Sequence, residues 1–217
     1  TVSLGIWAGV GTRHEILEHN GVAHLLEHMA FKGTRRRSAL AIAEEIESVG
    51  GLLNAYTGRE QTAYYAKMLA DDMPLAIDVL SDILQNSVYD EAELERERAV
   101  VLQEIGQAED TPDYIVFDRF QETAFPGQSM GWPVLGRAEI VRDLPRDVVA
   151  GYLESRYRPE QMVVAASGKI DHGQLVDLAN RLLDKLPTGK APHGGRATYR
   201  GGEYKAQREL EQVNVVL

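Results

Sequence analysis

The chain has 217 residues, of which 44% are hydrophobic and 26% are charged, a composition typical of globular domains. Its length allows one ample domain or two small ones with a sizeable core. With 23 basic and 33 acidic side chains the net charge is −10, which disfavours a nucleic-acid partner. No apolar run reaches bilayer-spanning length, so we expect no membrane association. The absence of cysteine excludes disulfides and thiolate zinc ligands and favours a reducing compartment.

The predicted elements mix strands and helices without a strict strand-helix alternation. Apolar periodicity, together with Gly, Pro, Asn, Asp and Ser at the ends of segments, locates them. In chain order we predict a strand over 2–10, helices over 20–31 and 38–49, strands over 52–56 and 62–69, helices over 71–84, 90–108, 111–120 and 145–157, a buried strand over 162–167, a helix over 171–186 and a strand over 210–217. This order favours an α+β fold, a mostly antiparallel sheet with helices packed on one face.

The composition of the C-terminal region predicts where the domains divide. The region 189–208 begins with a stretch rich in Gly, Pro and basic residues that has no periodicity and therefore predicts a linker. We expect residues 1–188 to form one domain and residues 209–217 to begin another, cut off by the chain end.

The run His24-Leu25-Leu26-Glu27-His28 is the strongest functional signal. Residues four apart lie on one face of a helix, so His24 and His28 can converge on one zinc ion, with Glu27 close enough to act on a metal-bound water. The order H-x-x-E-H is that of the inverzincin metallopeptidases. The alternative is a pair of surface histidines on a helix.

A catalytic zinc site usually needs a third protein ligand, and the acidic segment from Asp90 offers several. Glu97 and Glu104 are seven residues apart and share a helical face. Apolar residues surround Glu104, and a carboxylate in such a place needs a compensating cation. Composition does not select among the candidates, and a charge-rich helix is more often a solvated surface. The other candidates on or near this segment are Glu91, Glu93, Glu95 and Glu109.

The chain resembles the N-terminal, catalytic half of the pitrilysin-type (M16) zinc metallopeptidases, and within them the mitochondrial processing peptidase β-subunits and their bacterial relatives. The segments that carry the resemblance are 21–34, 50–57 and 96–105. The resemblance implies the processing-peptidase/LuxS-like metallohydrolase fold and one Zn²⁺ per chain. It also implies that residues 209–217 begin a second homologous half.

The resemblance assigns roles to site residues. It implies Glu104 as the third ligand beside His24 and His28, because the spacing of 76 residues (104 − 28) matches the family. With zinc held by these three residues, we expect Glu27 to act as the general base on the metal-bound water. Glu97 resembles an additional acidic residue of the family that is important for activity without being a ligand.

Substrate contacts are expected on 52–57 and at Asp118. An extended peptide can add itself to an edge strand there, with contacts to Asn54, Ala55 and Tyr56; the alternative is an ordinary core strand. Processing peptidases receive a basic substrate residue between a Glu and an Asp. Asp118 matches that Asp, but Tyr114 stands in the Glu position, which weakens an expected preference for Arg.

The sequence therefore predicts a zinc-dependent metalloendopeptidase that cuts extended peptides or presequences. Its partners would be a peptide or unfolded polypeptide and a second homologous half, in cis or as a separate subunit. The alternatives are a non-enzymatic assembly subunit on the same fold, a half-enzyme inactive without its partner domain, and a zinc hydrolase of small molecules. We expect a bacterial cytoplasmic location, or the mitochondrial matrix if the source is eukaryotic.

Overall fold

The computed structural model describes residues 1–190 and 194–217. A four-stranded antiparallel sheet forms its framework within these residues. The strands are β1 (Val2–Ala8), β2 (Leu52–Thr57), β3 (Thr62–Met68) and β4 (Met162–Gly168), in the spatial order β2-β3-β1-β4. β2 and β4 are therefore the two edges of the sheet.

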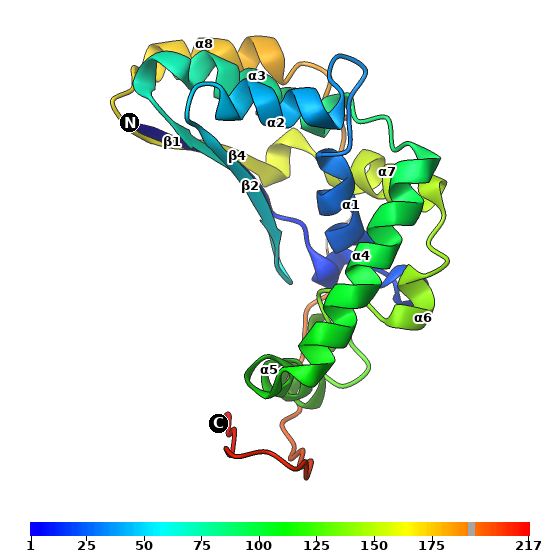
Figure 1. Cartoon of the computed structure of the whole chain (residues 1–217). Coiled ribbons are helices and arrows are strands. Elements are labelled where there is room, and N and C mark those ends of the chain that lie inside the picture. The colour runs from blue at the N-terminus through cyan, green and yellow to red at the C-terminus, as the bar shows by residue number, and fades with distance from the viewer. Residues whose placement is uncertain (191–193) are drawn as a thin grey trace.

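Helices cover one face of this sheet, and α2, α3 and α8 lie over it in Figure 1. The α-helices are α1 (Val22–Ala30), α2 (Ala39–Glu47), α3 (Met73–Gln85), α4 (Glu91–Asp110), α5 (Pro112–Ala124), α6 (Ala138–Val141), α7 (Arg146–Arg156) and α8 (His172–Leu182). Short 3-10 helices span Thr12–His14, Leu17–His19, Ala70–Asp72, Ser129–Gly131 and Pro159–Gln161. The predicted α+β fold, with an antiparallel sheet and helices on one face, is confirmed.

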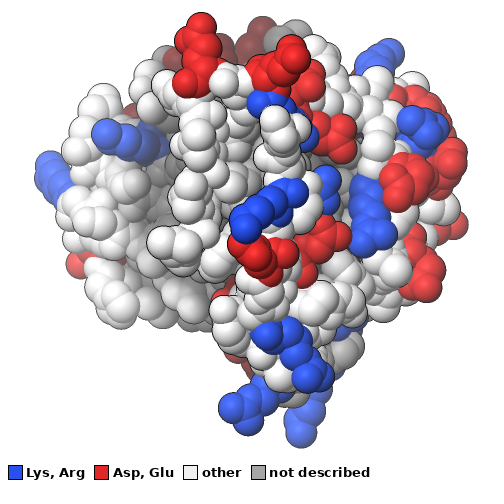
Figure 2. Space-filling view, turned by 90° about the horizontal axis from the view of Figure 1, so that it is seen from below, with Lys and Arg blue, Asp and Glu red and all other residues white. Residues whose placement is uncertain are grey.

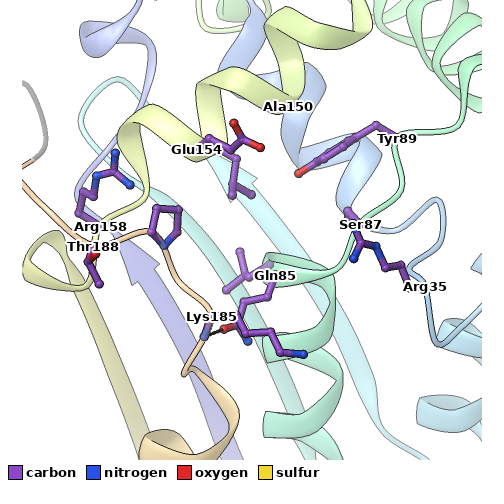
Figure 3. A pocket seen from close by; sticks show the side chains of 12 residues that line it. Arg35, Gln85, Ser87, Tyr89, Ala150, Glu154, Arg158, Lys185 and Thr188 are labelled. Atoms are coloured by element: carbon purple, nitrogen blue, oxygen red, sulfur yellow. Dashed lines mark hydrogen bonds between the residues drawn. The ribbon is translucent and has the colours of Figure 1, made fainter.

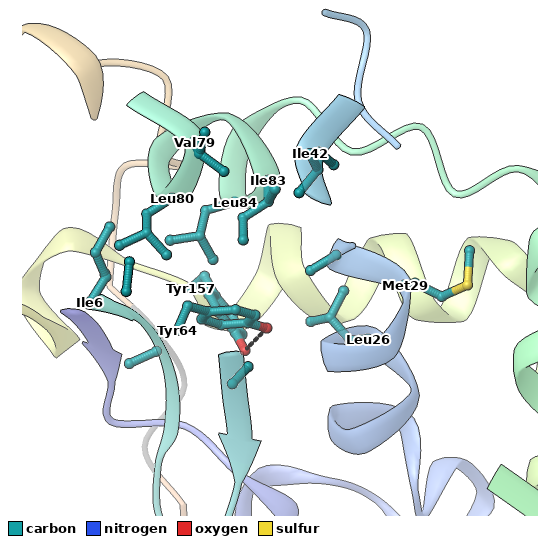
Figure 4. Packing of buried hydrophobic residues seen from close by; sticks show 14 of the residues in the cluster. Ile6, Leu26, Met29, Ile42, Tyr64, Val79, Leu80, Ile83, Leu84 and Tyr157 are labelled. Carbon is teal, nitrogen blue, oxygen red and sulfur yellow. Dashed lines mark hydrogen bonds between the residues drawn. The ribbon is translucent and has the colours of Figure 1, made fainter. Parts of the chain in front are cut away.

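The core lies between the sheet and the helices. Alternate residues of a strand point to one face, and on this face Ile6 of β1 stands opposite Tyr64 of β3. The hydroxyl groups of Tyr64 and Tyr157 lie 3.2 Å apart in a hydrogen bond at the centre of the core. Leu26 of α1 and Leu80 of α3 pack into the same cluster (Figure 4). The sheet, α1 and α3 are thereby fixed to one another by buried contacts.

Most predicted elements form, and their start signals act as expected at two helices. The Ser38 hydroxyl accepts a hydrogen bond from the Ala41 amide at the start of α2. The Asp90 carboxylate accepts from two amides at the start of α4. Both arrangements are N-caps, which satisfy amides that have no partner inside the helix.

Two strand predictions differ from the structure. The segment 162–167 is a strand, but it is not buried, because β4 lies at an edge and Val163 is 60% exposed. A continuous apolar run does not reveal whether both faces of a strand are covered. Residues 210–217 form no strand, since a strand needs a neighbour to satisfy its backbone groups.

Helix ends also differ from the prediction. The helix expected to end at Leu186 ends at Leu182, and the helix expected from Asp71 begins at Met73, after a 3-10 turn. The four-residue α6 was not predicted, since it is too short to display a period. The described residues of 189–208 form no helix or strand, and residues 191–193 lie outside the described chain. Among the described residues, no helix combines the length and apolarity needed to cross a membrane.

Candidate metal centre

Helix α1 presents both histidines of the sequence motif on one side. The ring centroids of His24 and His28 are 4.6 Å apart, with the rings inclined at 70°. The intervening Leu25 and Leu26 are fully buried and hold the opposite side of the helix against the core. This arrangement follows from helix geometry, in which residues i and i+4 are neighbours on the surface.

The start of α1 is capped by the side chain of Glu15 and not by that of Asn20, the first residue of the predicted helix. The Glu15 carboxylate accepts hydrogen bonds from the amides of Gly21 and Ala23 and from the Asn20 side chain, each at 2.9 Å. Gly21 has φ +100, and a Cβ there would come within 2.8 Å of the Gly136 Cα. The chain therefore enters α1 through a tight backbone contact, where Asn20 is turned toward Glu15. Burial raises the pKa of Glu15 to about 7.

Glu104 reaches the two histidines from α4, which runs beside α1 (Figure 1). Its Oε2 atom lies 3.7 Å from His24 Nε2 and 3.6 Å from His28 Nε2. One ligand atom from each of the three residues lies within 4.8 Å of the other two. Among the acidic residues of α4 considered from sequence, Glu104 is the one that forms this group with the histidines within the described residues.

The donor set fits a zinc ion. Four ligands around tetrahedral zinc, with bonds of about 2.0–2.1 Å, stand roughly 3.3–3.4 Å apart, close to the separations between Glu104 and the two imidazoles. Burial, and then repulsion from His28, lowers the pKa of His24 to about 3, so its ring is neutral and its nitrogen can bind a cation. Two imidazoles and one carboxylate could hold the ion and leave a fourth position open.

Glu97 contacts Nδ1 of His28, whereas Glu104 lies near Nε2 of the same ring. Its Oε2 atom is 2.9 Å from His28 Nδ1, and its Oε1 atom is 2.7 Å from Lys32 Nζ. Its side chain is 7% exposed. A hydrogen bond from Nδ1–H to a carboxylate fixes the histidine tautomer in which Nε2 is free to bind a metal. In contrast, His24 Nδ1 is buried without a hydrogen-bond partner in the described residues.

Glu27 lies on the same helix but outside the three-residue group. The Thr57 hydroxyl, at the end of β2, donates a hydrogen bond of 2.5 Å to Glu27 Oε2. Burial raises the pKa of Glu27, while the Thr57 hydrogen bond lowers it. A carboxylate that is held in place and has a raised pKa is a suitable proton acceptor near neutral pH.

The predicted substrate-contact strand lies at the sheet edge. β2 pairs with β3 on one side, and its other side has no strand neighbour in the described chain. Asn54 and Tyr56 are exposed, whereas Ala55 is buried toward the helices. The Tyr56 hydroxyl accepts a hydrogen bond of 2.9 Å from the Gln61 side chain. The backbone of β2 is thus available for pairing with another extended chain.

Asp118 is paired within the protein. Its Oδ1 atom lies 2.7 Å from Nη2 of Arg59, which follows β2. Both side chains are mostly buried, at 19% and 18% exposure for Arg59 and Asp118. Tyr114 lies close enough to both charges for them to act on its hydroxyl, and burial raises its pKa. A basic substrate residue would therefore have to displace Arg59 to reach Asp118.

Several residues of this region were not found from sequence. Glu15, Lys32, Thr57 and Arg59 each contact a predicted site residue or its helix from a different segment. Lys32 lies beyond the end of α1 at Ala30 and pairs with Glu97 of α4. For all four residues the contact depends on tertiary structure, and no local pattern indicates it.

Comparison with known proteins identifies the family of the chain. The family model described as "Insulinase (Peptidase family M16)" matches residues 1–138. The chain belongs to peptidase family M16. A second family model, described as "Peptidase M16 inactive domain", matches residues 143–217. The resemblance inferred from the sequence is thereby confirmed.

Curated M16 relatives are similar over nearly all of this chain. A protein of Rickettsia bellii called an uncharacterized zinc protease is 39% identical over 217 residues, which are 100% of this chain and 53% of that protein. The human mitochondrial-processing peptidase subunit beta is 45% identical over 191 residues, 88% of this chain and 39% of that protein. The chain thus spans about half the length of its curated bacterial relative and less of the mitochondrial one.

Solved structures of M16 proteins share the fold. Pitrilysin superposes with a TM-score of 0.78 at 25% identity, over 88% of this chain and 21% of its own. A chain of Complex III2 from Candida albicans gives a TM-score of 0.81 at 26% identity, over 94% of this chain and 46% of its own. A protease from Helicobacter pylori, at 21% identity, shows the fold alone, with a TM-score of 0.83 over 92% of this chain and 48% of its own.

Proposed function

We propose that the chain is the catalytic half of a zinc metalloendopeptidase that hydrolyses extended peptides or presequences. The observation that carries the proposal is the convergence of His24, His28 and Glu104, with Glu27 held beside them by Thr57. The zinc-protease name of the Rickettsia relative supports the metal. One such group lies within the described residues, so we propose one Zn²⁺ per chain.

Each site residue has a defined task in this proposal. When bound, zinc polarises the scissile carbonyl and lowers the pKa of water toward neutrality. Glu27 accepts the proton of the attacking water and later delivers it to the leaving amine. The Thr57 hydroxyl holds the Glu27 carboxylate in place for this proton transfer. Glu97 acts through His28, whose tautomer and orientation it fixes, and so supports activity without being a ligand.

The peptide would bind in extended form along β2. Its backbone would add to the free edge of the sheet beside Asn54, Ala55 and Tyr56, which lead to Thr57 and so to Glu27. Main-chain hydrogen bonds of this kind give affinity without a fixed sequence. The face seen in Figure 2 also has a broad uncharged area beside mixed acidic and basic side chains, which suits a polypeptide ligand.

The remaining half of the enzyme would come from outside this chain. We propose residues 1–188 as the catalytic domain, 189–208 as a linker and 209–217 as the start of a second homologous half, joined in cis or supplied as a subunit. The partial coverage of the relatives supports this. Similarity to bacterial and mitochondrial proteins is compatible with the bacterial cytoplasm or, in a eukaryote, the mitochondrial matrix.

Arg59 occupies the Asp118 carboxylate and should therefore hinder Asp118 from binding a basic residue of the substrate. In the Arg59→Ala variant the carboxylate is released, so cleavage of peptides with Arg near the scissile bond should rise about tenfold relative to matched Ala peptides, as expected for one gained charge pair. The measurement is kcat/KM for the two peptides. An Arg13→Ala variant, which breaks the nearby Arg13–Glu60 pair, is the matched control. An unchanged Arg/Ala ratio in Arg59→Ala would remove Asp118 from the substrate site.

The principal alternative is a non-enzymatic subunit on the same fold. The similarity to a chain of Complex III2 is the reason to consider a non-enzymatic subunit. Against it, this chain has a metal-binding residue at each of the three ligand positions, His24, His28 and Glu104. The discriminating experiment is digestion of an unstructured peptide by the full-length protein, with its partner half, before and after zinc removal by a chelator. We expect cleavage that stops with the chelator and returns with added Zn²⁺. Absence of peptide cleavage in the zinc-loaded protein would favour the subunit or a small-molecule hydrolase.

A further inference from the structure

A second candidate site lies away from the metal centre, between the end of α3, α7 and the segment that follows α8. It is a pocket of about 560 Å³, within the range of small-molecule sites. Its lining residues include none of the metal-centre residues. Figure 3 shows side chains from these three parts of the chain facing a common space.

The pocket is positively charged on a protein whose net charge is −10. Arg35, Arg158 and Lys185 line it against a single carboxylate, Glu154. In Figure 3 Arg35 and Arg158 stand on opposite sides of the pocket, with Lys185 between them. A ligand that satisfies all three must therefore carry more than one anionic group.

Arg158 provides an independent sign of a missing partner. Its Nε and Nη1 atoms are buried and have no hydrogen-bond partner in the described part of the chain. Buried charged donors without acceptors are costly, and the planar guanidinium fork fits carboxylate and phosphate oxygens. Arg158 therefore lines the pocket with part of its hydrogen-bonding capacity unused in the described part of the chain.

Tyr89 adds a neutral donor to the same space. Its hydroxyl points into the pocket in Figure 3. Burial raises the pKa of Tyr89, so the hydroxyl keeps its proton and can donate to an anion. Its backbone has φ +50, an uncommon conformation for a residue with a large side chain.

We propose that this pocket binds a small organic polyanion that carries at least two phosphate or carboxylate groups. Phosphate and carboxylate groups share the oxyanion chemistry that arginine recognises. Titration with one probe of each kind shows which of the two the pocket binds. The proposal does not depend on peptidase activity, because pocket and metal centre have no residue in common.

The test is calorimetric titration of the full-length, zinc-loaded protein at a constant ionic strength of about 0.15 M, to limit nonspecific charge effects. Fructose 1,6-bisphosphate and tricarballylate, which bind zinc weakly, are the phosphate and carboxylate probes. We expect one or both to bind with one site per chain. Arg158→Gln and Lys185→Gln should each weaken binding about tenfold, the effect of losing one charge-assisted contact.

Arg142→Gln is the matched control, because Arg142 is exposed and does not line the pocket. This variant should bind each probe with the same affinity as the wild type. If Arg158→Gln does not fold, Lys185→Gln and Arg35→Gln decide the question. No binding of either probe up to about 10 mM, the range of very weak complexes, would overturn the proposal. Equal weakening in Arg142→Gln would also overturn it, since the attraction would then be general and not located in the pocket.

Discussion

The Glu27→Gln variant should lose about 10³-fold in kcat while it retains zinc. The amide has nearly the same size and can still accept the Thr57 hydrogen bond, but it cannot take a proton from water. A factor of about 10²–10⁴ is typical of a lost general base. The measurement is steady-state peptide hydrolysis together with elemental analysis of the same sample.

The control for this variant is Glu44→Gln, at an exposed position of α2, which should behave as the wild type. Zinc content separates the two ways in which Glu27→Gln could fail. Loss of both metal and activity would indicate a structural role for Glu27. Retained zinc with near-normal turnover would show that another group accepts the proton.

The Glu104→Ala variant should lose zinc affinity by at least about 100-fold, and activity with it. Its carboxylate is the acidic member of the group, and two imidazoles alone leave the ion with half of a tetrahedral shell. Loss of hydrogen-bond partners outside the ligand shell already costs about 10–100-fold in metal affinity, so loss of a ligand should cost more. Competition titration with a zinc-binding dye measures the change.

Glu109→Ala is the matched control for the ligand assignment. Glu109 lies on the same helix and is exposed, and the sequence alone left it as a ligand candidate. Its replacement should leave zinc affinity unchanged. Wild-type affinity in Glu104→Ala would remove Glu104 from the site.

The parts of the site that sequence could predict are local. His24 and His28 share a helix, so their spacing alone predicts adjacent rings, and the rings are adjacent in the structure. Helix spacing alone could not identify Glu104. Several carboxylates follow Asp90, and the composition of that segment does not show which of them faces α1. Only the family resemblance selected it, and in the structure it is Glu104 that lies next to the imidazoles.

The parts that could not be predicted depend on contacts between distant segments. The capping of α1 by Glu15 requires a carboxylate from a preceding turn to replace the more local Asn20. The pairing of Asp118 with Arg59 joins residues 59 positions apart. The prediction that β4 is a buried strand was also wrong, because an apolar run describes the strand itself and not what packs against it.

The most direct test of the central claim is X-ray absorption at the zinc edge of the zinc-loaded protein. The proposed site predicts a first shell of nitrogen and oxygen donors at about 2.0–2.2 Å, with multiple scattering from two imidazole rings. In Glu104→Ala samples loaded at high zinc concentration, the imidazole signal should persist while one oxygen donor is lost or replaced. A wild-type spectrum with one imidazole or none would contradict the metal centre formed by His24, His28 and Glu104.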